Sequence, residues 1–317
     1  MVDDSLGARA APRVSSVVGP QEPMFSPTTA PAQALQSAEE VLHFASSSLG
    51  AIDQSVDLSR ARSPHRVRLL ATRSGSQFIA KWFDDSTSYF RSLDAMNHHT
   101  IPLGTQAPRL IAHDDRLKAL LMTHLPGEVA GDYTARDPVT HFQVGKLLRQ
   151  FHESSTPNPS AQATTDLASG LSRLTEELED DLGQVLVAEL RELGMQLLDL
   201  GPEPLQPVHG GIRPEHWMVD ENYGVQLFSF SSSQYDPWIK DTLDLERQYW
   251  RYQPELKSAF FGGYDRAPSE SDELLLRGFL AQNALTSWAE VMRRSSTKKS
   301  RQLAWAEVEH ATGCTLF

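Results

Sequence analysis

The sequence predicts an α+β fold in which a small sheet-rich half precedes a larger helix-rich half. Strand-like runs occur in the first half at 51–58, 65–72, 76–83, 107–112 and 119–122. The segment Leu125-Pro126-Gly127 then breaks the chain, and apolar residues recur at helical spacing in most of the second half. This change of pattern sets a boundary near Gly127, with an amino-terminal lobe over 36–125 and a carboxy-terminal lobe over 126–317.

The composition is that of a globular protein and limits the classes of partner. The 317 residues are enough for a large core, and the mean hydropathy is -0.38. No apolar run approaches the roughly 20 residues of a membrane span, and the net charge of -12 disfavours nucleic acid and anionic membranes as partners. The single cysteine, Cys314, excludes an internal disulfide framework, so we expect a cytoplasmic protein.

Alternation and turn signals predict the elements of the amino-terminal lobe. Apolar residues alternate along the run 65–72, and Ser74-Gly75-Ser76 is typical of a hairpin turn. Helical spacing of apolar residues predicts helices over 38–49 and 86–97. Residues 1–35 are rich in Pro, Ala, Ser and Thr, which predicts a disordered or extended arm.

Helical spacing also predicts most of the carboxy-terminal lobe. The expected helices cover 139–152, 168–200, 241–250, 255–261, 271–292 and 304–309, and the expected strands cover 217–219 and 225–228. The helix over 168–200 is rich in leucine and carries an acidic cluster made of Glu176, Glu177, Glu179, Asp180 and Asp181. These carboxylates are too many for one helical stripe, so some must face solvent, where they would suit a basic partner.

The stretch from His209 to His216 reads His-Gly-Gly-Ile-Arg-Pro-Glu-His. It resembles the catalytic loop of the aminoglycoside phosphotransferase-like (choline kinase-like) family, which reads His-Gly-Asp-x-x-x-x-Asn, and the spacing fits without a gap. Further along, Leu227-Phe228-Ser229-Phe230 occupies the place of the family's Ile-Asp-Phe-Gly. The resemblance covers about residues 51–288 and implies a bilobal protein kinase-like fold, with a small β-rich N-lobe and a larger helical C-lobe.

Other segments resemble the family in the same order along the chain. They are Phe78-Ile79-Ala80-Lys81, the hinge-like Leu121–Gly127, the helix Gly145–His152, Asp236-Pro237, Asp244-Leu245 and Gly263-Tyr264. The resemblance implies that Lys81 reaches the nucleotide phosphates. It also implies that the hinge, with Met122 and His124, contacts adenine.

The sequence departs from the family at the positions that carry chemistry. Gly211 stands in the place of the catalytic Asp, His216 in the place of a metal-binding Asn, and Ser229 in the place of the second magnesium ligand. Glycine cannot act as a base, magnesium is usually held through carboxylates, and imidazole prefers softer metals. The resemblance therefore implies a degenerate, pseudokinase-like member with no assigned catalytic residue and no metal site.

The surroundings of Lys81 leave alternatives open. The loop over 58–65 carries arginine and proline where the family has glycines, so its backbone cannot cradle phosphates closely. The helix position that matches the family's lysine-pairing glutamate falls near Tyr89 or Phe90. Lys81 is then expected either to bind a phosphate or to pair with one of the nearby carboxylates Asp84, Asp85 and Asp94.

Three further carboxylates, Glu215, Asp236 and Asp244, are candidates to rescue catalysis. The family positions that match Asp236 and Asp244 are largely structural and tie helices beside the active centre. Buried histidine and aromatic residues of this stretch, such as His209 and Trp217, are interpreted as structural.

These observations favour a pseudokinase that acts as a binding, scaffold or regulatory subunit. Its partner would be a protein or peptide, for example a partner enzyme in natural-product biosynthesis. The alternative is a divergent ATP-dependent phosphotransferase that acts on a small-molecule hydroxyl or on Ser or Thr of a peptide, paired with a lyase. ATP and magnesium are cofactors only under this alternative. A third interpretation is a binder of a small non-nucleotide metabolite in the cleft.

Overall fold

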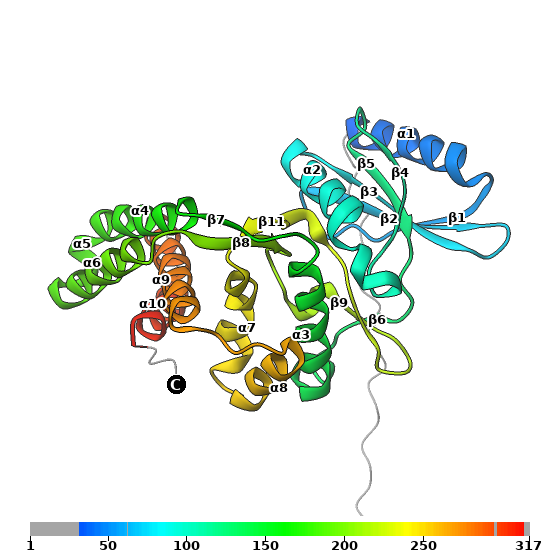
Figure 1. The fold of residues 1–317 in the computed structure, drawn as a ribbon. Helices are drawn as coiled ribbons and strands as arrows, with labels where there is room; N and C mark the ends of the chain where they lie inside the picture. The colour runs from blue at the N-terminus through cyan, green and yellow to red at the C-terminus, as the bar shows by residue number, and fades with distance from the viewer. Residues whose placement is uncertain (1–31, 62, 295–296, 314–317) are drawn as a thin grey trace, which may run out of the picture.

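The computed structural model describes residues 32–61, 63–294 and 297–313, and Figure 1 shows their arrangement in two lobes. Helix α1 (Ala32–Leu49) already begins at Ala32, so the helix expected from residue 38 starts earlier. The rest of the arm predicted over 1–35 lies outside the described residues. The α+β bilobal, kinase-like fold class predicted from the sequence is confirmed.

The N-lobe is built on an antiparallel sheet in the order β1-β2-β3-β5-β4. Its strands are β1 (Ile52–Asp57), β2 (His65–Thr72), β3 (Gln77–Phe83), β4 (Leu110–Asp114) and β5 (Ala119–Thr123). Side chains alternate between the two faces of a strand, so the two faces carry separate apolar clusters. Val41 and Ala45 of α1 pack on one face, against Leu70, Ala80, Trp82 and Leu121.

The other face of the sheet points towards α2 (Ser86–Asp94), with Phe83, Tyr89, Met96, Leu120 and Met122 in its cluster. Asp85 begins this helix by accepting a hydrogen bond from the Ser88 amide at 2.7 Å. The predicted helix over 86–97 changes character near its end, because Ala95–His99 is a π-helical turn and Ile101–Gln106 follows as 3₁₀ helix.

The two lobes meet at Gly127. Its φ is +109°, and an added Cβ would lie 2.3 Å from the Val219 carbonyl oxygen, so only glycine fits. The short strand β6 (Glu128–Val129) then pairs with β9 (Trp217–Val219), which also pairs with β10 (Val225–Leu227). The chain beyond Gly127 therefore continues into the C-lobe.

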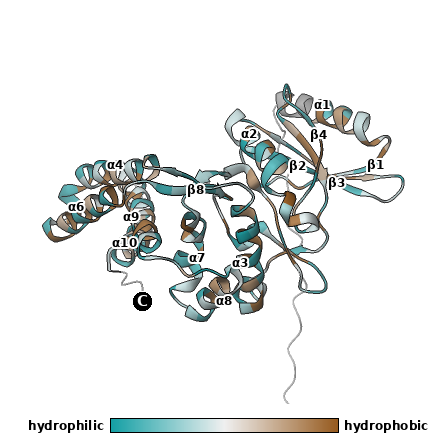
Figure 2. Cartoon of the chain, in the orientation of Figure 1, coloured by the Kyte–Doolittle hydropathy of each residue, from teal (hydrophilic) through white to brown (hydrophobic). Residues whose placement is uncertain are grey.

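The C-lobe contains a helical core and a short three-stranded sheet in the order β11-β8-β7. Its helices are α3 (Pro138–His152), α4 (Gln162–Glu177), α5 (Glu179–Leu182), α6 (Gln184–Asp199), α7 (Leu243–Leu245), α8 (Pro254–Tyr264), α9 (Glu270–Arg293) and α10 (Lys298–Gly313). The strands are β7 (Asn158–Ser160), β8 (Glu203–Val208) and β11 (Gln234–Asp236). Figure 2 shows brown, hydrophobic and teal, hydrophilic stretches alternating along the helices of the C-lobe, as expected for helices with one buried face.

The single helix predicted over 168–200 is wrong. The segment forms α4, α5 and α6, because Gly183 has a φ of +77° that ends one helix and starts the next. The strands β7, β8 and β11, which join these helices to the rest of the lobe, were not predicted. The segment predicted as a helix over 241–250 is also irregular: it begins inside the 3₁₀ turn Trp238–Thr242, continues as α7 and ends in the π-helical turn Glu246–Trp250.

Helices α3 and α8 cross at two glycines. A Cβ on Gly145 would lie 2.2 Å from the Phe260 carbonyl oxygen, and a Cβ on Gly263 would lie 1.9 Å from the Phe142 carbonyl oxygen. This close approach buries Leu148 and Phe260 in the main core. None of the described helices combines the length and the apolarity that a membrane span requires.

Gly145→Ala and Gly194→Ala are predicted to change stability in opposite directions. Gly145→Ala places a methyl group against backbone, which typically costs about 1–3 kcal/mol. Gly194 lies within α6, and an added Cβ there meets nothing within 4 Å. Gly194→Ala should therefore stabilise by about 0.5–1 kcal/mol through helix propensity. Urea unfolding of both variants measures the two effects, and equal effects would contradict the proposed crossing.

Candidate functional site

Lys81 lies on β3, on the face of the sheet that points towards α2 and the C-lobe. Its side chain is 8% exposed, and its ammonium lies 4.8 Å from the centre of the Phe83 ring. Burial lowers the pKa of Lys81 to about 8, because the charged form loses its hydration. Among the described residues, no carboxylate lies within ion-pair distance of this ammonium.

The carboxylates considered as partners of Lys81 have other roles. Asp85 caps α2, and Asp94 contacts His98 at 2.8 Å. At the position matching the family's lysine-pairing glutamate, Tyr89 is fully buried and donates a hydrogen bond to Asp115 at 2.5 Å. The expected pairing of Lys81 with Asp84, Asp85 or Asp94 is therefore not formed, which leaves the lysine without a fixed countercharge.

The strand alternation that places Lys81 also decides where the predicted hinge residues lie. Met122 pairs with Ile79 across β3 and β5 and belongs to the apolar cluster beside Lys81. His124 follows the end of β5, and burial lowers its pKa, so it is neutral at pH 7. Its backbone amide is directed at the Gln77 carbonyl at 3.4 Å. The structure thus places Met122 on the Lys81 side of the sheet and His124 in the link between the lobes.

Asp241 holds the catalytic loop in shape. Its carboxylate accepts hydrogen bonds from the backbone amides of His209 and Gly210, both at 2.7 Å, and from His152 Nε2 at 2.9 Å. Burial opposes its charge, but these hydrogen bonds hold the pKa of Asp241 below its ordinary value. Asp244 does not make these contacts; it lies 3.5 Å from Arg213 and 3.6 Å from Arg247.

Two neutral imidazoles lie inside the loop. His209 donates from Nε2 to the Phe228 carbonyl at 2.9 Å, and His216 donates from Nδ1 to the Gly211 carbonyl at 2.6 Å. Burial, then the proximity of His209, lowers the pKa of His216 to about 3; burial also lowers the pKa of His209. The Lys81 charge contributes to both pKa shifts, so the lysine lies on the side of the N-lobe that is near the loop.

The positions of the family's two aspartates carry no acidic side chain. A Cβ on Gly211 would meet nothing within 4 Å, so the space for a side chain is open. Ser229 is half-buried and follows Phe228, whose carbonyl accepts the hydrogen bond from His209. Its backbone is left-handed, with φ 75° and ψ 55°. Asp and Asn adopt this conformation more readily than other non-glycine residues. The backbone at Ser229 is therefore suited to the residue that is missing.

The magnesium ion implied by the family resemblance does not fit these side chains. Magnesium is held through carboxylate oxygens, whereas the three positions offer no side chain, a neutral imidazole and a hydroxyl. Within the described part of the chain, no group of three or more His, Cys, Asp or Glu side chains is arranged to hold a metal. The donor set thus disagrees with a magnesium-dependent kinase centre.

The three candidate rescue carboxylates lie in different surroundings. Asp236 is bound to Lys240 and accepts from Gln234 at 2.6 Å, which occupies it structurally. Asp244 lies 3.5 Å from Arg213 and 3.6 Å from Arg247. Burial raises the pKa of Asp244, the charges of Arg213 and Arg247 oppose this shift, and the charge of exposed Glu215 adds to it. Asp244, which is paired with Arg213 of the loop, and Glu215, which belongs to the loop, are therefore the two candidates beside it.

Asp241, His152 and Tyr264 were missed as a connected group. Tyr264 donates to His152 Nδ1 at 2.8 Å, and His152 donates onward to Asp241. The helix ending in His152 was recognised, and a buried histidine requires an acceptor, but the sequence alone did not show which of several aspartates supplies it.

Several phosphotransferases of known structure have the same fold. Macrolide 2'-phosphotransferase MphH from Brachybacterium faecium is 13% identical, with a TM-score of 0.58 over 86% of this chain and 98% of that chain. An aminoglycoside phosphotransferase from Alicyclobacillus acidocaldarius is 15% identical, with a TM-score of 0.56 over 83% and 89%. The GDP complex of aminoglycoside 2'-phosphotransferase-IIIa is 12% identical, with a TM-score of 0.60 over 89% and 99%. At these identities the likeness concerns the fold.

A search of curated proteins finds no match. A family model described as "Phosphotransferase enzyme family" matches residues 57–274, which include Lys81, the hinge and the whole catalytic loop. This match spans both lobes, and by it the chain belongs to the phosphotransferase enzyme family.

Proposed function

We propose that this chain is a pseudokinase that binds an anionic ligand in the cleft between its lobes and does not transfer a phosphoryl group. The supporting observation is the side-chain set at Gly211, His216 and Ser229, which contains no carboxylate. Phosphoryl transfer in this fold requires a group that orients the nucleophile and ligands that hold magnesium on the phosphates. Losing the positioned base alone typically costs about 10²- to 10⁴-fold in rate.

The charge of the cleft favours an anion without a metal. Lys81 is buried and has no carboxylate partner among the described residues, while the nearby imidazoles of His209 and His216 are neutral. A phosphate or carboxylate would supply the missing countercharge, and such charge-assisted hydrogen bonds are strong in a dry site. A magnesium ion would instead be repelled by the ammonium and would find no carboxylate at positions 211 and 229.

A protein or peptide partner is part of this proposal, because a kinase-like fold that keeps its cleft but lacks the catalytic carboxylates would act by binding. In the acidic cluster Glu179 pairs with Arg191 at 3.0 Å and Glu177 pairs with Arg293. Asp180 and Asp181 are exposed. These two carboxylates are the part of the cluster best placed to contact a basic peptide or a partner enzyme. We infer that such a partner acts in natural-product biosynthesis.

A divergent ATP-dependent phosphotransferase is the second candidate, and Asp244 is the observation that favours it. Its carboxyl group is half-buried beside the loop, and its pKa is raised by burial. Raised carboxyl pKa values are suited to general bases that work near neutral pH. The acceptor would be a small-molecule hydroxyl or Ser or Thr of a peptide, in a pathway that includes a lyase.

Binding of ATP in EDTA should depend on the charge of Lys81. Because its pKa is about 8, calorimetric affinity should be constant below neutral pH and fall by up to about tenfold per unit above 8. Lys81→Arg should remove this pH dependence, and Lys81→Met should remove binding. Without ligand, the free energy of unfolding should rise between pH 8 and 10.5, because the unfolded chain binds more protons at this lysine. Binding that survives Lys81→Met would contradict the proposal.

Magnesium should not increase ATP affinity in the natural sequence. In the triple variant Gly211→Asp, His216→Asn and Ser229→Asp, it should increase affinity by about tenfold or more, because two carboxylates return to open positions. The matched control places Asn at all three positions, which keeps the shape and removes the charge, and it should show no response. A strong magnesium response of the natural sequence would overturn the pseudokinase proposal.

Asp244→Asn separates the two candidate functions. Under the pseudokinase proposal, radiolabelled ATP gives no transfer to water, protein or added hydroxyl compounds in either the natural sequence or the variant. Under the second candidate, transfer occurs and falls by about 10²-fold or more in Asp244→Asn. Asp236→Asn, at a carboxylate bound to Lys240, is the control that should leave such transfer in place.

A further inference from the structure

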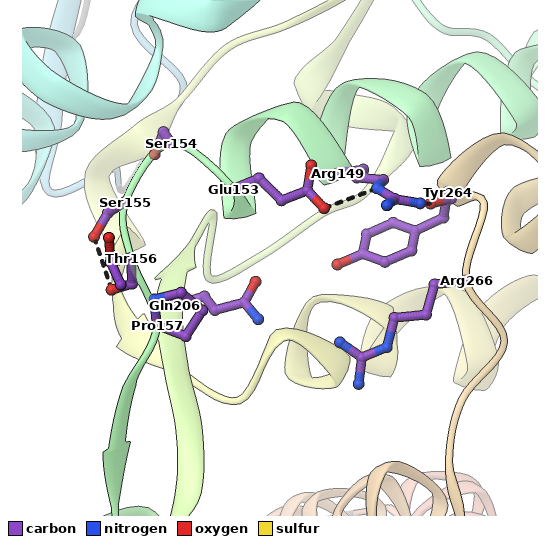
Figure 3. Close-up of a pocket in the computed structure, with 9 residues that line it drawn as sticks. All are labelled: Arg149, Glu153, Ser154, Ser155, Thr156, Pro157, Gln206, Tyr264 and Arg266. Carbon is purple, nitrogen blue, oxygen red and sulfur yellow. Dashed lines mark hydrogen bonds and ion pairs between the residues drawn. The ribbon is translucent and has the colours of Figure 1, made fainter.

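A pocket of about 550 Å³ lies in the C-lobe, outside the cleft between the lobes (Figure 3). Its walls come from the end of α3, the link to β7, strand β8 and the link between α8 and α9. The side chains that matter here are Arg149, Glu153, Gln206, Tyr264 and Arg266. Its volume is within the range of small-molecule sites.

A buried layer separates this pocket from the catalytic loop. Tyr264 lines the pocket and donates to His152, which is 1% exposed and donates to Asp241. Asp241 in turn holds the backbone of His209 and Gly210. The pocket therefore lies behind the loop, and its lining includes neither Lys81 nor any residue of the loop from His209 to His216.

Gln206 points to a ligand. The residue is only 6% exposed, and Figure 3 shows its side chain extending from β8 into the pocket. The backbone of this strand is paired with β11, and among the described residues no protein group forms a hydrogen bond with the side-chain amide, so the amide is open to the pocket. A polar group that enters the pocket would therefore find both a donor and an acceptor on Gln206.

Two charged groups face the same space from opposite walls. Arg266 donates from Nη2 to Asp272 at 2.9 Å, and within the described residues its other nitrogens have no hydrogen-bond partner. Glu153 accepts from Arg149 with one oxygen at 2.9 Å, and its side chain is 61% exposed. Figure 3 shows Glu153, Gln206 and Arg266 lining the pocket from different parts of the chain, with the Glu153 carboxylate turned towards Arg149.

We propose that this pocket binds a small zwitterion of the α-amino acid or dipeptide class. Arg266 would receive its carboxylate, Glu153 its ammonium group, and Gln206 an amide or other polar group between them. Both guanidinium groups are already neutralised, Arg266 by Asp272 and Arg149 by Glu153 and Asp265. A dianion such as phosphate would therefore meet carboxylates as well, whereas a zwitterion brings one charge for each wall.

The pocket is tested by calorimetry on the full chain. The probes are individual L-α-amino acids and glycyl-glycine, their N-acetyl amides, glucose and inorganic phosphate. The zwitterions should bind and the N-acetyl amides, which lack both charges, should not. Binding of glucose or phosphate alone, or of no probe, would overturn the proposal.

Variants then locate the binding. Gln206→Leu and Arg266→Met should each weaken affinity by at least about tenfold, because each removes a donor to the ligand. Gln77→Leu and Arg294→Met change exposed residues of the same types outside the pocket and should leave it unchanged. Thermal unfolding checks that the variants are folded. Equal affinities in all four variants would assign the binding elsewhere and contradict the pocket.

Discussion

The arrangement of the loop from His209 to His216 depends on the carboxylate of Asp241. It is fully buried and accepts from His152 and from the backbone amides of His209 and Gly210. A buried carboxylate is stable only when its lone pairs are used, so these donors must stay in place. Gly210 adds a second constraint, since its φ is +81° and a Cβ would lie 2.1 Å from the Ser232 carbonyl oxygen. The shape of the catalytic loop therefore depends on groups that do not transfer phosphate.

The same architecture determines the electrostatics of the cleft. Strand alternation places Lys81 and Met122 on one face of the N-lobe sheet, and α2 packs on that face. Burial of the lysine thus follows from the fold, whereas its countercharge depends on particular side chains of α2 and of the loop. Here those side chains are an aromatic ring, a glycine, a neutral imidazole and a serine. The outcome is a desolvated cation whose pKa is lowered, in a cleft that is complementary to an anion.

Much of this arrangement could be predicted from the sequence, because local patterns decide it. Alternation predicts the N-lobe strands, and the resemblance to the family predicts the loop from His209 to His216. The pairing of the loop with Asp241 could not be predicted, because several aspartates follow at similar distances and only the 3₁₀ turn Trp238–Thr242 selects one. The break at Gly183 was missed because leucine spacing continues through it. The pocket around Gln206 depends on three elements distant in sequence, which no local pattern reports.

The sequence departs from the family's pattern at positions where a substitution costs little folding free energy. Replacing Asp241 would leave two buried backbone amides and His152 without an acceptor, which costs roughly 1–3 kcal/mol for each group. At position 211 a side chain would face open space, and Ser229 makes no hydrogen bond on which the described fold depends. A carboxylate at either position serves a metal or a substrate and supports no neighbouring element. The described fold therefore does not depend on a carboxylate at position 211 or 229, which is compatible with the binding function that we propose.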